Sequence, residues 1–86
     1  MPRISAFYGI VISMYFDDHT PSHFHAVYGE FEAKISIADG AIIQGWLPRR
    51  ARRRVKSWTD LHRLELEENW KRARTGMELA NIEPLR

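Results

Sequence analysis

The 86-residue sequence contains no cysteine, which excludes disulfide bonds, thiolate zinc fingers and cysteine nucleophiles. It also has no long apolar run. The longest, residues 10–14, is interrupted by Ser13 and is far too short to cross a bilayer. We therefore expect no transmembrane helix, no signal peptide and a cytoplasmic location, with which the lack of disulfides is compatible.

Internal repeats and low-complexity tracts are also missing, and only five glycines and four prolines interrupt the chain. What is present is typical of a folded domain, since 44% of the residues are hydrophobic and 28% are charged. A chain of this length has room for one core, which buries roughly 60–65% of the unfolded surface. We predict one domain over residues 1–86, folded alone or with a second copy of itself.

The first half of the chain has the two-residue periodicity of β-strands. Residues 4–16 read as one strand, with Tyr8, Ile10, Ile12, Met14 and Phe16 on its core face, and Gly9 indicates a bulge or a bend. Residues 17–22 have turn composition, residues 23–28 resume a strand, and residues 30–37 alternate as a half-buried antiparallel strand. After a turn at 38–40, residues 41–46 complete the predicted sheet, a four-stranded antiparallel meander over residues 4–46.

Beyond Pro48 the period changes to that of a helix. At about 100° per residue, one apolar stripe comprises Ala51, Val55, Trp58, His62, Leu66, Trp70 and Ala73. We predict an α+β fold, in which one long amphipathic helix (49–74) packs on one face of the sheet. Ser57 is an alternative helix start, because Ser-x-x-Asp resembles a capping box. The tail, residues 77–86, has three apolar side chains with which to dock, although it is also able to fray.

Three of the four histidines lie in or after the predicted turn. A two-residue type II′ turn at Gly29-Glu30 would pair His23 with Ser36 and His25 with Lys34. Both histidines then point away from the helix. One hypothesis is a zinc site formed by His19, His23 and His25, because H-x-H on a strand places two imidazoles about 7 Å apart on one face.

The H-x-H pair supplies two ligands, and the third would come from His19, Asp17, Asp18 or Glu32. The structural alternative is that His25 lies on an open sheet face beside Lys34, while His19 and His23 hold the turn through hydrogen bonds. A lysine next to His25 disfavours a bound cation.

A polar row interrupts the apolar stripe of the predicted helix, formed by His62, Glu65 and Asn69. Polar groups in a core-facing stripe need hydrogen-bond partners. One interpretation is catalytic: His62 and Glu65 would be a general acid/base pair, and the Asn69 amide would orient a substrate. The architectural interpretation is that these side chains hydrogen-bond the helix to backbone groups of loops or strands. We favour the architectural interpretation because no nucleophile is identifiable beside the row. Trp58 and Trp70 are expected to pack in or at the edge of the core.

Six of the thirteen basic residues fall within eight positions, which we call the basic segment (residues 49–56). They are Arg49, Arg50, Arg52, Arg53, Arg54 and Lys56. At the start of a helix these cations oppose the helix dipole, so an anionic partner would relieve a local cost. Nucleic acid and an acidic protein surface both fit, and a solvated basic surface is the structural alternative.

The order of residues resembles a family of small bacterial proteins known as the domain of unknown function numbered four-one-six-zero. Its pattern is a short F-x-G-I strand, then H-x-P-x-H-F-H, then Y-G-E, then a helix ending in E-L-x-x-N-W. The matching residues are Phe7, Gly9, Ile10, His19, Pro21, His23, Phe24, His25, Tyr28, Gly29, Glu30, Glu65, Leu66, Asn69 and Trp70. Ser22 departs from the second proline that the family often carries. The resemblance implies a regulatory partner of a second small protein encoded alongside, in an arrangement similar to toxin–antitoxin modules, and it implies no established activity.

The leading functional hypothesis is therefore a cytoplasmic binding module, acting with a protein partner and with nucleic acid as a further contact through the basic segment. One alternative is a metal- or histidine-assisted nuclease or hydrolase that uses His19, His23 and His25. The other is a ligand-free homodimer, in which the sheet face carrying His25 and Lys34 forms the interface.

Overall fold

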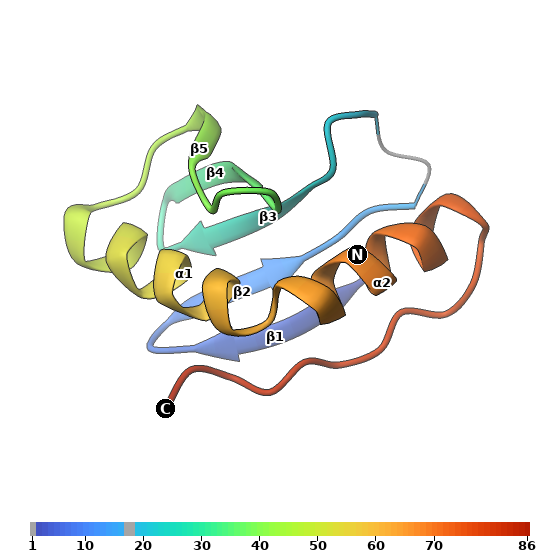
Figure 1. The fold of residues 1–86 in the computed structure, drawn as a ribbon. Helices are drawn as coiled ribbons and strands as arrows, with labels where there is room; N and C mark the ends of the chain where they lie inside the picture. The colour runs from blue at the N-terminus through green and yellow to red at the C-terminus, as the bar shows by residue number, and fades with distance from the viewer. Residues whose placement is uncertain (1, 17–18) are drawn as a thin grey trace.

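The computed structural model describes residues 2–16 and 19–86. An antiparallel sheet of five strands, arranged in chain order, lies against two helices that cover one of its faces (Figure 1). The strands are β1 (Arg3–Phe7), β2 (Ile10–Ser13), β3 (His23–Tyr28), β4 (Phe31–Ser36) and β5 (Ile42–Gly45), and the helices are α1 (Arg49–Leu61) and α2 (Arg63–Arg74). The α+β class and the meander are confirmed, whereas the numbers of strands and helices differ from the prediction.

The single strand predicted over residues 4–16 is two strands joined by a tight turn. Tyr8 and Gly9 both have positive φ, 51° and 79°, which is the backbone of a two-residue type I′ hairpin turn. Alternation alone did not reveal this turn, because tyrosine seldom adopts a left-handed conformation. The correction places Tyr8 at an exposed hairpin tip rather than on the core face.

The predicted register between β3 and β4 is confirmed. His23 pairs with Ser36, His25 with Lys34, and Tyr28 with Phe31. Gly29 has a φ of 58°, as the first central residue of a type II′ turn requires. The apolar faces of the two strands therefore coincide toward the helices.

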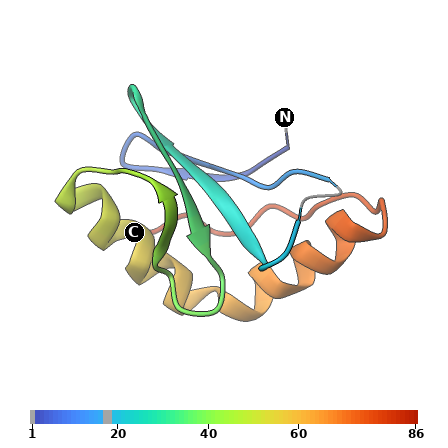
Figure 2. The same ribbon diagram turned by 90° about the horizontal axis from the view of Figure 1, so that it is seen from above.

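The predicted helix 49–74 is interrupted at His62, whose φ of −118° and ψ of 25° are not helical. The chain continues at once into α2, and the Leu66 amide still donates to the His62 carbonyl at 2.9 Å. Ser57 lies inside α1, so the alternative start is wrong as well. Because the sheet is twisted, one straight helix would diverge from it. The break allows the apolar faces of both α1 and α2 to pack on the sheet. Figure 2 shows both helices beneath the curved sheet.

The core lies between the sheet and the helices, and its largest member is Trp58 of α1. The Trp58 ring packs against Phe7 and Phe24, with centroid distances of 5.3 and 5.6 Å. The C-terminal tail docks beside β1, where the Ile82 amide donates to the Ile4 carbonyl at 2.8 Å (Figure 1). No helix in the described part of the chain has the length and apolar character that crossing a membrane requires.

Candidate anion-binding site

The basic segment forms the first two turns of α1. The first turn of α1 contains no acidic residue, and Pro48 at the N-cap provides no side-chain hydrogen bond. The free backbone N–H groups and the positive end of the helix dipole therefore lie among arginines. This is the local arrangement that the sequence predicted, and it favours an anion.

One side of α1 faces an open pocket with a volume of about 640 Å³. Its cationic wall consists of Arg49, Arg52, Arg53 and Lys56, and its opposite wall is formed by Asp39, Gly40, Ala41 and Ile42 together with Ile35 of β4. The turn approaches α1 closely at Gly40, where a Cβ would lie 2.8 Å from Cδ of Lys56. The sequence alone did not indicate that the turn after β4 completes a pocket with the basic helix.

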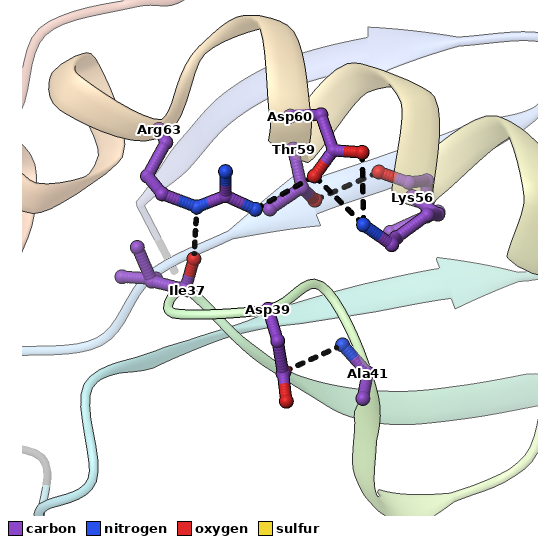
Figure 3. Close-up of polar contacts among 8 residues, drawn as sticks. Ile37, Asp39, Ala41, Lys56, Thr59, Asp60 and Arg63 are labelled. Atoms are coloured by element: carbon purple, nitrogen blue, oxygen red, sulfur yellow. Dashed lines mark hydrogen bonds and ion pairs between the residues drawn. The ribbon is translucent and has the colours of Figure 1, made fainter.

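A polar network includes Lys56 of the pocket lining. The Asp60 carboxylate accepts hydrogen bonds from Lys56 Nζ at 2.8 Å and from an Arg63 guanidinium nitrogen at 2.7 Å (Figure 3). Nε of Arg63 in turn donates to the Ile37 carbonyl at 2.9 Å, which joins the start of α2 to the end of β4. These hydrogen bonds, first that of Lys56 and then that of Arg63, hold the pKa of Asp60 below its usual range. Asp60 thus shares its single negative charge between Lys56 and Arg63.

The arginines of the pocket have no such counter-charge. Among residues 2–16 and 19–86, no carboxylate forms an ion pair with Arg49, Arg52 or Arg53. Asp39 is the acidic residue of the pocket lining, and its Oδ1 accepts a hydrogen bond from the Ala41 amide at 3.0 Å. The pocket therefore has an excess of positive charge that an anionic ligand or surface would neutralise.

The remaining two arginines of the segment lie on another side of α1. The guanidinium of Arg54 lies over the ring of Tyr8, 4.1 Å from the ring centroid. Arg50 and Arg54 line a small hollow together with Tyr8 and Tyr28. The predicted basic segment is thus divided between an open pocket and an aromatic surface.

His23 has a structural position at the start of β3. Its Nδ1 lies 2.8 Å from the Pro21 carbonyl oxygen, which can only accept, so Nδ1 is the donor. This bond holds the turn, as the structural alternative predicted. The prediction that His23 faces away from the helices is wrong, since its ring lies 5.4 Å from that of Trp70 in α2 and only 4% of the residue is exposed.

His25 does not lie on an open sheet face, because only 8% of the residue is exposed. The Tyr15 ring packs edge-on at 4.5 Å, and the His23 ring lies 5.3 Å away. Its Nδ1 is 3.4 Å from a carboxylate oxygen of Glu32. The face proposed for a homodimer is therefore covered at His25 by side chains of the same chain.

The histidines are not brought together as a metal site within the described part of the chain. No group of three histidine, aspartate or glutamate side chains there is arranged to hold a metal ion. His19 is exposed, whereas His23 and His25 are buried. The candidate ligands Asp17 and Asp18 lie outside the described residues. The zinc hypothesis thus has no ligand set among the residues described.

The polar row of the helix divides into two separate structural roles. Nδ1 of His62 lies 2.6 Å from Oε1 of Glu65 at the partly exposed break between α1 and α2. Asn69 is fully buried and binds the tail, donating to the Ala80 carbonyl at 2.8 Å and accepting from the Ala80 amide at 3.0 Å. Asn69 is therefore occupied by backbone groups, as the architectural interpretation predicted.

Comparison with protein families gives one assignment. A family model described as a domain of unknown function (DUF4160) matches residues 9–71. The chain belongs to the DUF4160 family. This confirms the resemblance inferred from the motifs, and the match includes the whole basic segment of α1. Neither the curated proteins nor the solved structures contain a significant match to this DUF4160 chain.

Sequence reasoning missed four exposed aromatic residues beside the basic helix of this DUF4160 protein: Tyr8, Tyr28, Phe31 and Trp46. Each lies at or next to the end of a strand. Two-residue periodicity extends the strand through these positions and therefore predicts that the aromatic side chains are buried. The available signal was the glycine next to three of them, at positions 9, 29 and 45, since a glycine within a strand pattern marks a turn or a bulge.

Proposed function

We propose that this protein is a small cytoplasmic binding module that works with a protein partner, in a pair resembling toxin–antitoxin modules. The basic helix α1 is the surface that holds the anionic face of the partner. In this proposal the domain acts by association rather than by catalysis.

The observation that carries the proposal is the uncompensated charge of the pocket. Arg49, Arg52 and Arg53 line an open cavity at the positive end of a 13-residue helix, and the nearby Asp60 is already occupied by Lys56 and Arg63. Charges held against the helix dipole reduce the stability of the isolated domain. A bound anionic surface relieves this destabilisation, which adds to the affinity, and the positive charge of the pocket speeds association with an anionic partner.

Binding is favoured over catalysis by the positions of the acid/base candidates. Asn69 is buried under the tail, while His62 and Glu65 lie at the helix break. His23 and His25 are packed among aromatic rings, His23 against Trp70 and His25 against Tyr15. Neither the pocket beside α1 nor the hollow at Arg50 and Arg54 is lined by any of these groups. General acid/base chemistry needs such groups within hydrogen-bond reach of one substrate.

The test uses the small protein encoded beside this one, co-expressed and purified with the full chain. Isothermal titration calorimetry at several salt concentrations measures the affinity and its salt dependence. The variant Arg49→Glu, Arg52→Glu, Arg53→Glu is expected to weaken binding at least tenfold and to flatten the salt dependence.

A matched control makes the same charge change elsewhere, with Arg3→Glu, Lys71→Glu and Arg86→Glu at exposed positions. The control is expected to change the affinity much less. Equal losses in the two variants, or no loss in the first, would remove α1 as the partner surface. Circular dichroism of both variants verifies that each retains its fold.

A further inference from the structure

An aromatic surface lies beside the basic helix. Tyr8, Tyr28, Phe31 and Trp46 are between 37% and 54% exposed, although large aromatic side chains are usually more buried. They come from the β1–β2 turn, the two ends of the β3–β4 turn and the segment after β5. Exposed aromatic side chains that gather at one place mark a binding surface.

The four aromatic residues lie in a row of neighbouring positions. The Tyr28 ring lies on the β1–β2 turn, because a Cβ on Gly9 would be 3.4 Å from it. Tyr28 pairs directly with Phe31 across β3 and β4, and the Phe31 ring meets the Trp46 ring edge-on at 4.9 Å. Figures 1 and 2 both place these two turns at the end of the domain where α1 begins.

Arginines border this row, which we call the aromatic row, along α1. Arg54 stacks over Tyr8, and Arg50 lines the same hollow as Tyr8 and Tyr28. The three arginines of the pocket continue the positive charge across α1. The nearby acidic residues are Glu30 in the β3–β4 turn, Glu32 on β4 and Asp39 across the pocket. Five arginines outnumber these carboxylates, and Glu32 also lies toward His25.

We propose that this end of the domain binds single-stranded nucleic acid, with bases stacked on the aromatic row and phosphates held by the arginines of α1. This inference goes beyond the proposed function, because it assigns a second anionic ligand, a nucleic acid, to the same helix. Stacked aromatic side chains next to a cationic track are the chemistry by which single strands are held without sequence preference. A duplex presents the cations with phosphates but hides the base faces that the rings would stack on.

The position of α1 also argues for a single strand. Ala51 and Val55 hold the helix against the sheet, so the sheet restricts its entry into the major groove of a duplex. The hairpin tips that carry Tyr8, Tyr28 and Phe31 are short two-residue turns, and a rigid platform loses little entropy when a base stacks on it. The aromatic row and the arginines are thus already arranged before a strand arrives.

Fluorescence anisotropy with a labelled 12-nucleotide oligothymidylate and its RNA counterpart tests the proposal. The variant Tyr8→Asn, Phe31→Thr, Trp46→Gln removes three rings, and asparagine at position 8 tolerates the positive φ. We expect at least tenfold weaker binding with an unchanged salt slope, since about tenfold per stacked base is typical. The control Leu61→Gln, Leu64→Gln, Met77→Gln removes exposed apolar side chains elsewhere and should bind as the parent does.

Two further measurements separate stacking from charge. Arg50→Gln with Arg54→Gln should lower the salt slope, by about 0.7 for each phosphate that the variant no longer neutralises. The single variant Trp46→Ala changes an exposed side chain outside the core, so it reports on stacking even if the triple variant unfolds. Unlabelled duplex DNA of equal length should compete more weakly than the single strand.

Parent-like binding of oligothymidylate by Trp46→Ala and by a folded triple variant would overturn the proposal. So would equal competition by duplex, or a parent protein that binds no oligonucleotide. If the aromatic variants instead weaken the complex with the co-encoded protein, the aromatic row serves a protein partner and the proposed function stands. A different result would separate the two proposals in the other direction. If Arg49→Glu, Arg52→Glu, Arg53→Glu leaves the complex with the co-encoded protein intact, while the aromatic variants weaken oligonucleotide binding, the protein-partner role of α1 fails and this inference stands.

Discussion

The side-chain amide of Asn69 makes a reciprocal pair of hydrogen bonds with the backbone of Ala80, donating at 2.8 Å and accepting at 3.0 Å. The pair joins α2 to the C-terminal tail. Oδ1 also accepts from Arg72 at 2.9 Å, so the amide oxygen accepts two hydrogen bonds. Asn69 thereby holds the tail in the position where Ile82 reaches β1.

Replacing Asn69 with alanine should release the tail. Two backbone groups of Ala80 lose their partner, which costs about 1–3 kcal/mol in the free energy of unfolding. Urea denaturation measures the loss, and hydrogen exchange at the Ile82 amide should accelerate with it. The control Asn81→Ala removes an exposed asparagine of the same tail and should change both quantities little. Equal effects of the two substitutions would contradict the role of Asn69.

Gly45→Ala should destabilise the protein more than Gly29→Ala. Both glycines have positive φ, 89° and 58°, so each substitution carries the left-handed backbone cost of about 1–2 kcal/mol. A Cβ at Gly29 meets nothing within 4 Å, whereas a Cβ at Gly45 collides with the carbonyl oxygen of Glu32. We expect an additional loss of about 1–3 kcal/mol for Gly45→Ala, because β4 and β5 have to separate. Indistinguishable urea midpoints would show that this close approach has no energetic consequence.

Trp58→Phe tests the bond between the core and the tail. Nε1 of Trp58 donates to the Glu83 carbonyl at 2.8 Å, and the indole is fully buried. Phenylalanine leaves that carbonyl without its donor and opens a small cavity, so we expect a loss of about 2–4 kcal/mol. Trp46→Phe is the control, since its indole is exposed. Thermal melts followed by circular dichroism should separate the two variants by more than about 5 °C, which is roughly the shift that 1 kcal/mol produces in a domain of this size.

The network around Asp60 predicts a pH dependence of stability. Lys56 and Arg63 hold the pKa of Asp60 below its unfolded value. The stabilisation is therefore present above the unfolded pKa of about 3.9, and it is lost as the pH falls through the lower folded pKa. Asp60→Asn should lower the melting temperature slightly at pH 7, because the carboxylate is exposed, and the difference should vanish toward acidic pH.

Glu78→Gln removes one negative charge from the exposed tail and supplies the comparison for Asp60→Asn. Melting curves of the three proteins between pH 7 and the acid limit measure the effect. A difference between the parent and Asp60→Asn that persisted at the lowest pH would assign the stabilisation to something other than ionised Asp60.

Local patterns predicted much of this fold. Two-residue alternation located β3, β4 and the core residues Phe24, Ala33 and Ile35, and the glycine at position 29 set the register between the two strands. Helical periodicity found the apolar stripe of both helices, and the charge pattern located the basic segment. These predictions succeed because each depends on neighbours within one or two turns or one hairpin.

The turn at Tyr8 and the break at His62 were not predictable in the same way. Tyr8 adopts positive φ in a tip where Arg54 and Tyr28 surround it, and both come from other elements. At His62 the residues on either side satisfy a helical pattern, but the two apolar faces have to follow a twisted sheet. In both places packing between distant segments outweighs local preference.

The histidines illustrate the same limit at the level of the candidate site. Register correctly assigned His23 and His25 to one face of β3, yet burial depended on Tyr15 and Trp70, which come from other segments. The division of the six cations between a pocket and an aromatic surface likewise depends on where the turns after β1, β3 and β4 approach α1. Residue order thus specifies the strands, the helical stripe and the charge, because these follow from backbone periodicity and short-range contacts. The sites arise when the folded sheet brings distant turns against α1, since close packing of separate segments is a property of the whole chain.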